Sequence, residues 1–234
     1  MTLDTEAVNF GPTPDVVVLD VRYGSMKNYN YLVVDPETRQ AVIVDPAWEM
    51  GKIEQAVSDA RATLRGVLVT HSHPDHMDLA RPLAEKYDCP IWMSNAEIAV
   101  MRFKTPRLAG IDSSSWRVGQ MLIEPILTPG HTPGSTCYLI GANLFTGDVL
   151  FAEGCGMCPD VQSAYAMFAS LELLKARLDP GTRIFPGHSY GQPAGQSMSR
   201  LRRENIYLQF PDKESFAAFR LRSTQDRAKL FSFR

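Results

Sequence analysis

The segment His71-Ser72-His73-Pro74-Asp75-His76 carries most of what this sequence reveals about its fold and its chemistry. Three of the five histidines in the chain lie within these six residues. The other two, His131 and His188, each follow a Pro-Gly pair at the end of a predicted strand. Because no histidine remains for the surface or for the core, we interpret the imidazoles as ligands of a metal centre.

The spacing within the segment predicts a first group of metal ligands. His71 and His73 stand two residues apart in extended chain, so their side chains can point the same way. His131 would add a third imidazole to this group. Neutral imidazoles suit zinc, iron or manganese, and we expect zinc, with iron or manganese as alternatives.

A second group of ligands follows from the next two residues. Asp75 and His76 are adjacent and come after the bend at Pro74, so they can face a second position, which His188 would complete. Asp148 is a carboxylate that could bridge two ions. Two bridged divalent ions can generate hydroxide at neutral pH and bind both the attacking and the leaving oxygen. We therefore expect a dinuclear centre, in which Asp75 is the catalytic residue that orients the hydroxide.

Each of these residues has an ordinary structural explanation when it is taken alone. His131 and His188 could be loop residues, Asp148 could form a turn, and Asp75 could cap the helix that follows it. Their coincidence at the ends of predicted strands, in this order, favours the metal centre.

The elements around these residues predict an α/β (α+β) fold. Strands are expected at 16–21, 29–34, 40–44, 66–70, 90–93, 121–127, 135–140, 143–146 and 183–185. Helices are expected at 52–61, 79–87, 164–178, 196–207 and 212–221. Two strand-rich halves with interleaved helices predict an αββα sandwich. We expect a catalytic domain over 1–190 and a helical C-terminal extension over 191–234 that packs on the active-site side.

The composition is that of a globular protein without a strong charge. Hydrophobic residues make up 44% of the 234 residues, charged residues 21%, and the net charge is -2, which argues against a nucleic-acid partner. No apolar run is long enough to span a membrane, and Met1–Phe10 does not resemble a signal peptide. We therefore expect a cytoplasmic protein with reduced thiols. Cys155 and Cys158 form a Cys-x-x-Cys, which glycines and a proline place in a tight loop rather than in a redox helix.

The whole pattern resembles the metallo-β-lactamase superfamily. The resemblance rests on His71-x-His73-x-Asp75-His76, then His131, Asp148 after Thr-Gly, and His188, and it spans residues 28–188. It implies an αββα sandwich with the metal site at one edge of its sheets. It also implies that Asp45 orders the metal-binding loop.

Within that superfamily the chain is similar to the glyoxalase II and persulfide dioxygenase branch. The similarity rests on the segments 146–156, 187–190 and 202–205. It implies substrate contacts from four positions, which are Met157, Tyr190, Arg202 and Asn205. Tyr190 and Arg202 match glyoxalase II, whereas Met157, Pro159 and Asn205 stand where that enzyme has a lysine, a tyrosine and a second lysine that bind glutathione. The glutathione pocket is therefore expected to be altered.

These features predict a metal-dependent thioesterase. The tail 207–220 resembles glyoxalase II-like hydrolases of bacterial polyketide gene clusters, which implies an acyl thioester on coenzyme A, an acyl carrier protein or glutathione. One alternative is a mononuclear iron persulfide dioxygenase that uses only His71, His131 and Asp148. Another is a true glyoxalase II, and a non-catalytic regulatory protein is a third.

Overall fold

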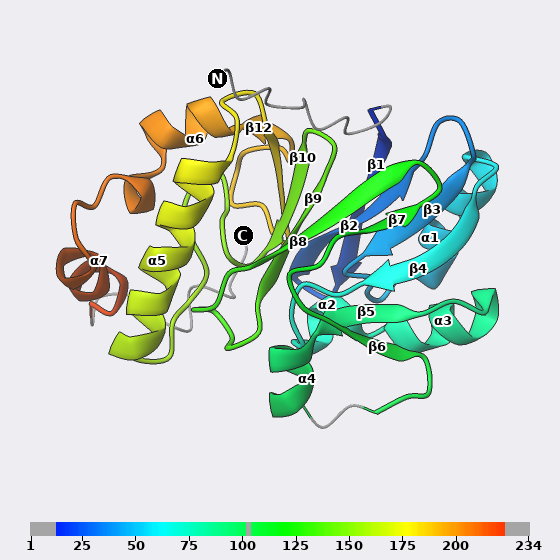
Figure 1. Cartoon of the computed structure of the whole chain (residues 1–234), viewed down its shortest axis with the longest axis horizontal. Coiled ribbons are helices and arrows are strands. Elements are labelled where there is room, and N and C mark those ends of the chain that lie inside the picture. Colours follow the sequence, from blue (N-terminus) through cyan, green and yellow to red (C-terminus); the bar gives the residue numbers. More distant parts are fainter. Residues whose placement is uncertain (1–12, 102–103, 223–234) are drawn as a thin grey trace, which may run out of the picture.

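Two six-stranded β-sheets form the centre of the computed structural model, which describes residues 13–101 and 104–222 (Figure 1). The strands of the first sheet are, in spatial order, β1 (Asp15–Tyr23), β2 (Met26–Val34), β3 (Gln40–Val44), β4 (Thr63–Leu68), β5 (Ile91–Ser94) and β6 (Leu108–Ile111). Those of the second sheet are β12 (Gln196–Ser197), β11 (Arg183–Pro186), β10 (Asn143–Gly147), β9 (Thr136–Ile140), β8 (Met121–Leu127) and β7 (Trp116–Val118). Both sheets mix parallel and antiparallel pairs, with β3 to β6 parallel in the first and β10 parallel to β11 in the second.

Helices cover the outer face of each sheet (Figure 1). On the first sheet these are α1 (Met50–Asp59) and α3 (Ala80–Tyr87), with α2 (Pro74–Met77) and α4 (Asn95–Val100) at one end. On the second sheet they are α5 (Val161–Arg177), α6 (Met198–Glu204) and α7 (Lys213–Arg220), with the 3-10 helix η1 (Ile206–Leu208) between the last two. Among the described residues, no helix combines the length and the apolar character that a membrane crossing needs.

Apolar side chains fill the space between the sheets and the space under each helical layer. Tyr31 of β2 packs against both Phe145 of β10 and Phe185 of β11, and this contact joins the two sheets. Ile53 of α1 and Leu83 of α3 are fully buried against the first sheet. These three apolar layers confirm the predicted αββα sandwich.

The boundaries differ from the predicted ones mainly at short elements. The sequence did not indicate α2, α4, β6, β7 or β12, which have two to six residues and are too short to show a hydrophobic period. The helix predicted at 196–207 is divided, because α6 ends at Glu204 and the Asn205 side chain accepts a hydrogen bond from the Tyr207 N–H to begin η1.

The C-terminal elements share their hydrophobic cluster with α5 and the second sheet. Leu201 of α6, Leu208 of η1 and Phe216 of α7 are buried in that cluster. The division into 1–190 and 191–234 remains a prediction. The segment 1–10, which we expect not to be a signal peptide, and the last residues of the tail, 223–234, lie outside the described residues.

Candidate metal centre

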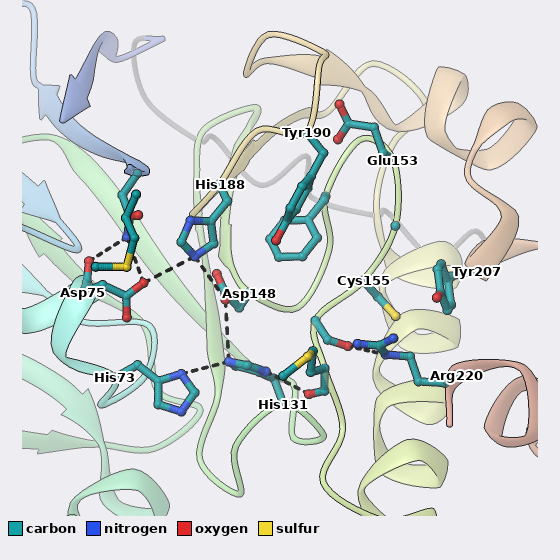
Figure 2. Close-up of a pocket in the computed structure, with 16 residues that line it drawn as sticks. His73, Asp75, His131, Asp148, Glu153, Cys155, His188, Tyr190, Tyr207 and Arg220 are labelled. Carbon is teal, nitrogen blue, oxygen red and sulfur yellow. Dashed lines mark hydrogen bonds and ion pairs between the residues drawn. The ribbon is translucent and has the colours of Figure 1, made fainter. Parts of the chain in front are cut away.

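The predicted ligands gather near one end of the two sheets. Figure 2 shows five of them, which are His73, Asp75, His131, Asp148 and His188. His71 and His73 follow β4, His131 follows β8, Asp148 follows β10, and His188 follows β11. Side chains from separate parts of the chain therefore meet at one edge of the sandwich.

Two glycines permit this close approach. Gly147, which precedes Asp148, has a φ of 47°, and a Cβ atom there would lie 2.2 Å from Thr70 Oγ1. A Cβ atom at Gly187 would lie 2.4 Å from Cε1 of His76. Only glycine fits these two positions, which explains the Thr-Gly-Asp and Pro-Gly-His patterns in physical terms.

The first group of donors consists of three imidazole nitrogens. His73 Nδ1 lies 3.0 Å from His71 Nε2 and 3.0 Å from His131 Nε2. The three side chains can each offer one nitrogen to a single ion. Burial, with a smaller contribution from the neighbouring imidazoles, holds the pKa of His71 well below 6.5, so this ring is in the neutral form that a metal ion requires.

The second group of donors lies beside the first. Asp75, His76 and His188 can also share one ion. His76 Nε2 lies 3.3 Å from His188 Nε2, and Asp75 Oδ2 lies 3.6 Å and 3.5 Å from these two nitrogens. This set of two imidazoles and one carboxylate suits zinc.

Asp148 lies between the two groups. Its Oδ2 is 3.6 Å from His131 Nε2 of the first group and 3.3 Å from His188 Nε2 of the second. Its Oδ1 is buried and has no hydrogen-bond partner among the described residues, although His76 Nε2 is 3.3 Å away. Burial opposes the ionisation of Asp148, but His188 and His76 outweigh burial and hold the pKa of this carboxyl well below 3.8. Asp148 therefore offers a negative charge to both groups.

The hydrogen bonds of the histidine rings orient their Nε2 atoms toward the centre, as metal binding requires. Four of the five histidines direct Nδ1 at an oxygen acceptor of the protein, which leaves the Nε2 lone pair for a metal ion. These pairs are His71 with Thr70 Oγ1 (3.0 Å), His76 with Asp45 Oδ2 (2.9 Å), His131 with the Met157 carbonyl (2.9 Å) and His188 with the Lys27 carbonyl (3.1 Å). Imidazole nitrogens of neighbouring histidines lie 3.0 to 3.3 Å apart with their lone pairs directed at one another, and Asp148 Oδ1 lacks a hydrogen-bond donor. Divalent cations between these atoms would satisfy all of them.

Asp45 fixes the base of the centre, as the resemblance implied. Its carboxylate is buried and accepts hydrogen bonds from the Thr70 N–H (2.8 Å), the Thr70 hydroxyl (2.7 Å) and His76 Nδ1. Because the Thr70 hydroxyl donates to Asp45, it must accept from His71 Nδ1. Asp45 also lies close to His71 and His76, but its oxygens are occupied by these hydrogen bonds, so we do not assign it a metal.

Asn28 is a residue of the site that the sequence did not indicate. Its Nδ2 donates to the backbone carbonyl of Asp75 (2.8 Å) and to Asp75 Oδ2 (3.2 Å). Asn28 lies on β2, far from any motif, so only the tertiary structure connects it to the centre.

A pocket with a cavity volume of about 340 Å³ opens above the metal donors (Figure 2). Two of the predicted substrate contacts, Met157 and Tyr190, line it. The residues that line it are Met26, Asn28, His73, Asp75, His131, Asp148, Phe151, Glu153, Gly154, Cys155, Gly156, Met157, His188, Tyr190, Tyr207 and Arg220. Of the residues that the sequence analysis missed, Tyr207 and Arg220 lie in the tail that resembles polyketide-cluster hydrolases, and Glu153 lies within the segment 146–156.

The other two predicted contacts lie elsewhere. The Arg202 guanidinium donates to the carbonyls of Lys175 (2.6 Å) and Leu178 (2.7 Å) and so caps the end of α5. Asn205 is buried, and its Nδ2 donates to the carbonyls of Phe151 (2.9 Å) and Gly154 (3.0 Å) behind the pocket wall. Both side chains make these contacts within the scaffold and neither lines the pocket, so their binding of substrate remains an untested prediction.

The two cysteines of the Cys-x-x-Cys are free and buried. Cys155 lines the pocket, and burial raises the pKa of its thiol strongly. Burial also raises the pKa of Cys158 to about 11. Both thiols are therefore protonated near neutral pH, which makes them weak nucleophiles.

Comparison with known proteins places this site in a family. The chain matches the model of the metallo-beta-lactamase superfamily over residues 27–188. It is 44% identical over 200 residues to the probable polyketide biosynthesis zinc-dependent hydrolase BaeB of Bacillus velezensis, which covers 85% of this chain and 89% of that protein. It is 40% identical over 209 residues to the probable polyketide biosynthesis zinc-dependent hydrolase PksB of Bacillus subtilis, covering 88% and 93%.

A solved structure supports the same relationship. The crystal structure of ETHE1 from Myxococcus xanthus superposes on the chain with a TM-score of 0.78 at 29% identity. The match covers 92% of this chain and 94% of that one.

Proposed function

The chain belongs to the metallo-beta-lactamase superfamily, and from this we propose that it is a zinc-dependent hydrolase of polyketide biosynthesis that cleaves an acyl thioester. The observation that carries the proposal is the double group of donors at the floor of an open pocket, with four imidazoles held by protein oxygens. The names of the two Bacillus relatives support the zinc dependence and the polyketide context.

Two ions would be held by the two groups of donors. His71, His73 and His131 would hold one, Asp75, His76 and His188 the other, and Asp148 would contact both. Zinc ions bound there polarise a carbonyl group and lower the pKa of water toward neutrality.

The chain's own residues would position the reacting groups. Asn28 fixes Asp75, and we assign Asp75 the role of holding the attacking water in the pocket. In the reaction the water oxygen forms a bond to the thioester carbonyl carbon. The C–S bond then breaks with its electron pair on sulfur, and the proton lost by the water leaves to solvent or to the thiolate.

The absence of a suitable proton donor favours a thiolate as leaving group. Among the described residues that line the pocket there is no lysine, and burial raises the pKa of Tyr190, which makes its phenol a poor acid. An amine leaving group needs a proton, whereas a thiol has a pKa of about 8.5 and can leave as the anion. This supports a thioester over a β-lactam or peptide substrate.

Metal analysis combined with thioester turnover tests the proposal. We expect about two zinc ions per chain and release of free thiol from acyl thioesters, and we expect His188→Ala to lower the zinc content toward one. One iron ion per chain with oxygen consumption on a persulfide would contradict the proposal and favour the dioxygenase, which would use only His71, His131 and Asp148. Intact thioesters in the presence of two zinc ions would also overturn it.

A further inference from the structure

One carboxylate in the pocket wall has no part in holding the metal donors. Glu153 lies in the loop that follows Asp148, and Figure 2 shows its carboxylate beside Tyr190, with the Tyr190 ring between it and His188 in this view. Its Oε1 accepts a hydrogen bond from the Gln192 N–H at 2.5 Å. Its Oε2 is buried and has no hydrogen-bond partner among the described residues.

A buried carboxylate oxygen without a donor is unfavourable, and a ligand can relieve it. Ionised carboxylates only accept hydrogen bonds, so the group that fits Oε2 is an N–H or O–H donor. Because Glu153 lines the pocket, a substrate lying over Tyr190 could bring such a donor to it.

The charge of the wall limits which substrates fit. Among the described residues that line the pocket, Arg220 is the only lysine or arginine, it is 4% exposed, and its Nε donates to the Gly156 carbonyl at 2.8 Å. Glu153 adds a negative charge, which contributes to the raised pKa of Tyr190 after the larger contributions of burial and Asp148. A substrate arm that carries carboxylates would therefore meet repulsion at this wall.

We propose that Glu153 determines which thiol arm the substrate carries. It would accept a hydrogen bond from an amide N–H of a neutral arm such as pantetheine, and its charge would repel the carboxylates of glutathione. This inference rests on the proposed thioester hydrolysis and assigns its specificity to one residue. A pantetheine arm is uncharged and carries two secondary amides. Glutathione also has amides, but its two carboxylates would have to approach the Glu153 charge.

A pair of matched substrates tests the hydrogen bond. One is an acyl thioester of N-acetylcysteamine, and the other replaces its amide N–H by an ester oxygen and so lacks the donor. We expect kcat/KM to favour the amide by roughly 10- to 100-fold, the usual effect of a hydrogen bond to a charged group. In Glu153→Gln the new amide oxygen must stay on the Gln192 N–H, so its NH2 group faces the pocket and cannot accept. The ratio of kcat/KM between the amide and the ester substrate should then fall to about one. Glu204→Gln on α6, outside the pocket lining, is the matched control and should keep the preference.

Binding of thioethers tests the charge without any hydrolysis. S-methylpantetheine and S-methylglutathione cannot be cleaved, and calorimetry gives their dissociation constants for the zinc-loaded protein. We expect wild type to bind the pantetheine thioether more tightly. Glu153→Gln should strengthen binding of the glutathione thioether by roughly tenfold, and Glu153→Lys should strengthen it further.

The outcomes separate this inference from the proposed function. If neither thioester is hydrolysed but the thioether preference depends on Glu153, the proposed function is wrong and the selective role of Glu153 stands. If both matched thioesters are hydrolysed equally, and Glu153→Gln changes neither ratio, the inference is overturned while thioester hydrolysis stands.

Discussion

Replacing Asp45 by asparagine should weaken zinc binding by the second group of donors, because Asp45 accepts a hydrogen bond from His76. Asp45 Oδ1 accepts from the Thr70 N–H, a donor that cannot reverse, so the new amide oxygen must take this position. The amide NH2 then replaces Oδ2, which accepts from the Thr70 hydroxyl and from His76 Nδ1 in the wild type. To accept from this NH2, His76 Nδ1 must lose its proton, and the ring proton moves to Nε2, the nitrogen that faces Asp75 and His188.

The size of the effect follows from these contacts. A wrongly paired donor at a position that is 2% exposed costs about 1–3 kcal/mol of folding free energy. Loss of an outer partner of a metal-binding histidine typically weakens metal affinity by about 10- to 100-fold. We therefore expect the second zinc ion to bind Asp45→Asn at least about tenfold more weakly. The first group should lose less affinity, because Asp45 contacts it only through the Thr70 hydroxyl, which is hydrogen-bonded to His71.

Competition with a chromophoric chelator gives the two zinc affinities, and urea unfolding of the metal-free protein gives the folding free energy. Asp35→Asn is the matched control, because Asp35 is fully buried and accepts hydrogen bonds from the Gln120 N–H and the Thr38 hydroxyl, with no metal donor nearby. It should lose a similar folding free energy and still bind two zinc ions. Wild-type affinity for both ions in Asp45→Asn would show that the His76 proton does not move from Nδ1 to Nε2.

Three further predictions concern other parts of the chain. Asn28→Ala should lower kcat/KM by roughly 10- to 100-fold, because Asp75 loses the two hydrogen bonds that Asn28 donates to its carbonyl and its carboxylate; unchanged kinetics would contradict this. Gly187→Ala should reduce the zinc content toward one ion per chain by metal analysis, because its Cβ would collide with His76. Burial would raise the pKa of Asp35, but hydrogen bonds from neighbouring groups outweigh burial and lower it below 3.8. The folding free energy of wild type should therefore hold above about pH 4 and fall, as acid titrates this group, relative to Asp35→Asn in urea unfolding series.

The sequence could predict the positions of the metal donors because local rules determine them. A buried strand followed by His71, or by Pro-Gly-His188, places the side chain at a strand end whatever the rest of the fold does. The glycines at 147 and 187 are equally local signals, since the close approach that each permits leaves no room for a Cβ atom. The layers of the sandwich follow from the same periodicity.

The pocket wall could not be predicted in this way. Asn28 contacts Asp75 across 47 residues of chain, and nothing in the sequence around it differs from an ordinary strand. Arg202 matched a family pattern, yet it caps α5, because a guanidinium satisfies two carbonyls at a helix end as well as it binds a ligand. Contacts of this kind depend on the tertiary packing of α5, α6 and α7.

The two sides of the pocket therefore have different physical requirements. The metal donors are fixed by partners such as Asp45 and Asn28, whose hydrogen bonds each have one acceptable geometry. The wall is built from the loop that carries Glu153 and from Tyr207 and Arg220, which lie beyond residue 188, where the family match ends. A change of charge at Glu153 removes none of the hydrogen bonds described above for the metal donors, because Glu153 hydrogen-bonds to the Gln192 N–H. Under the proposed thioester hydrolysis, the preference for a thiol arm can therefore change while the metal donors are retained.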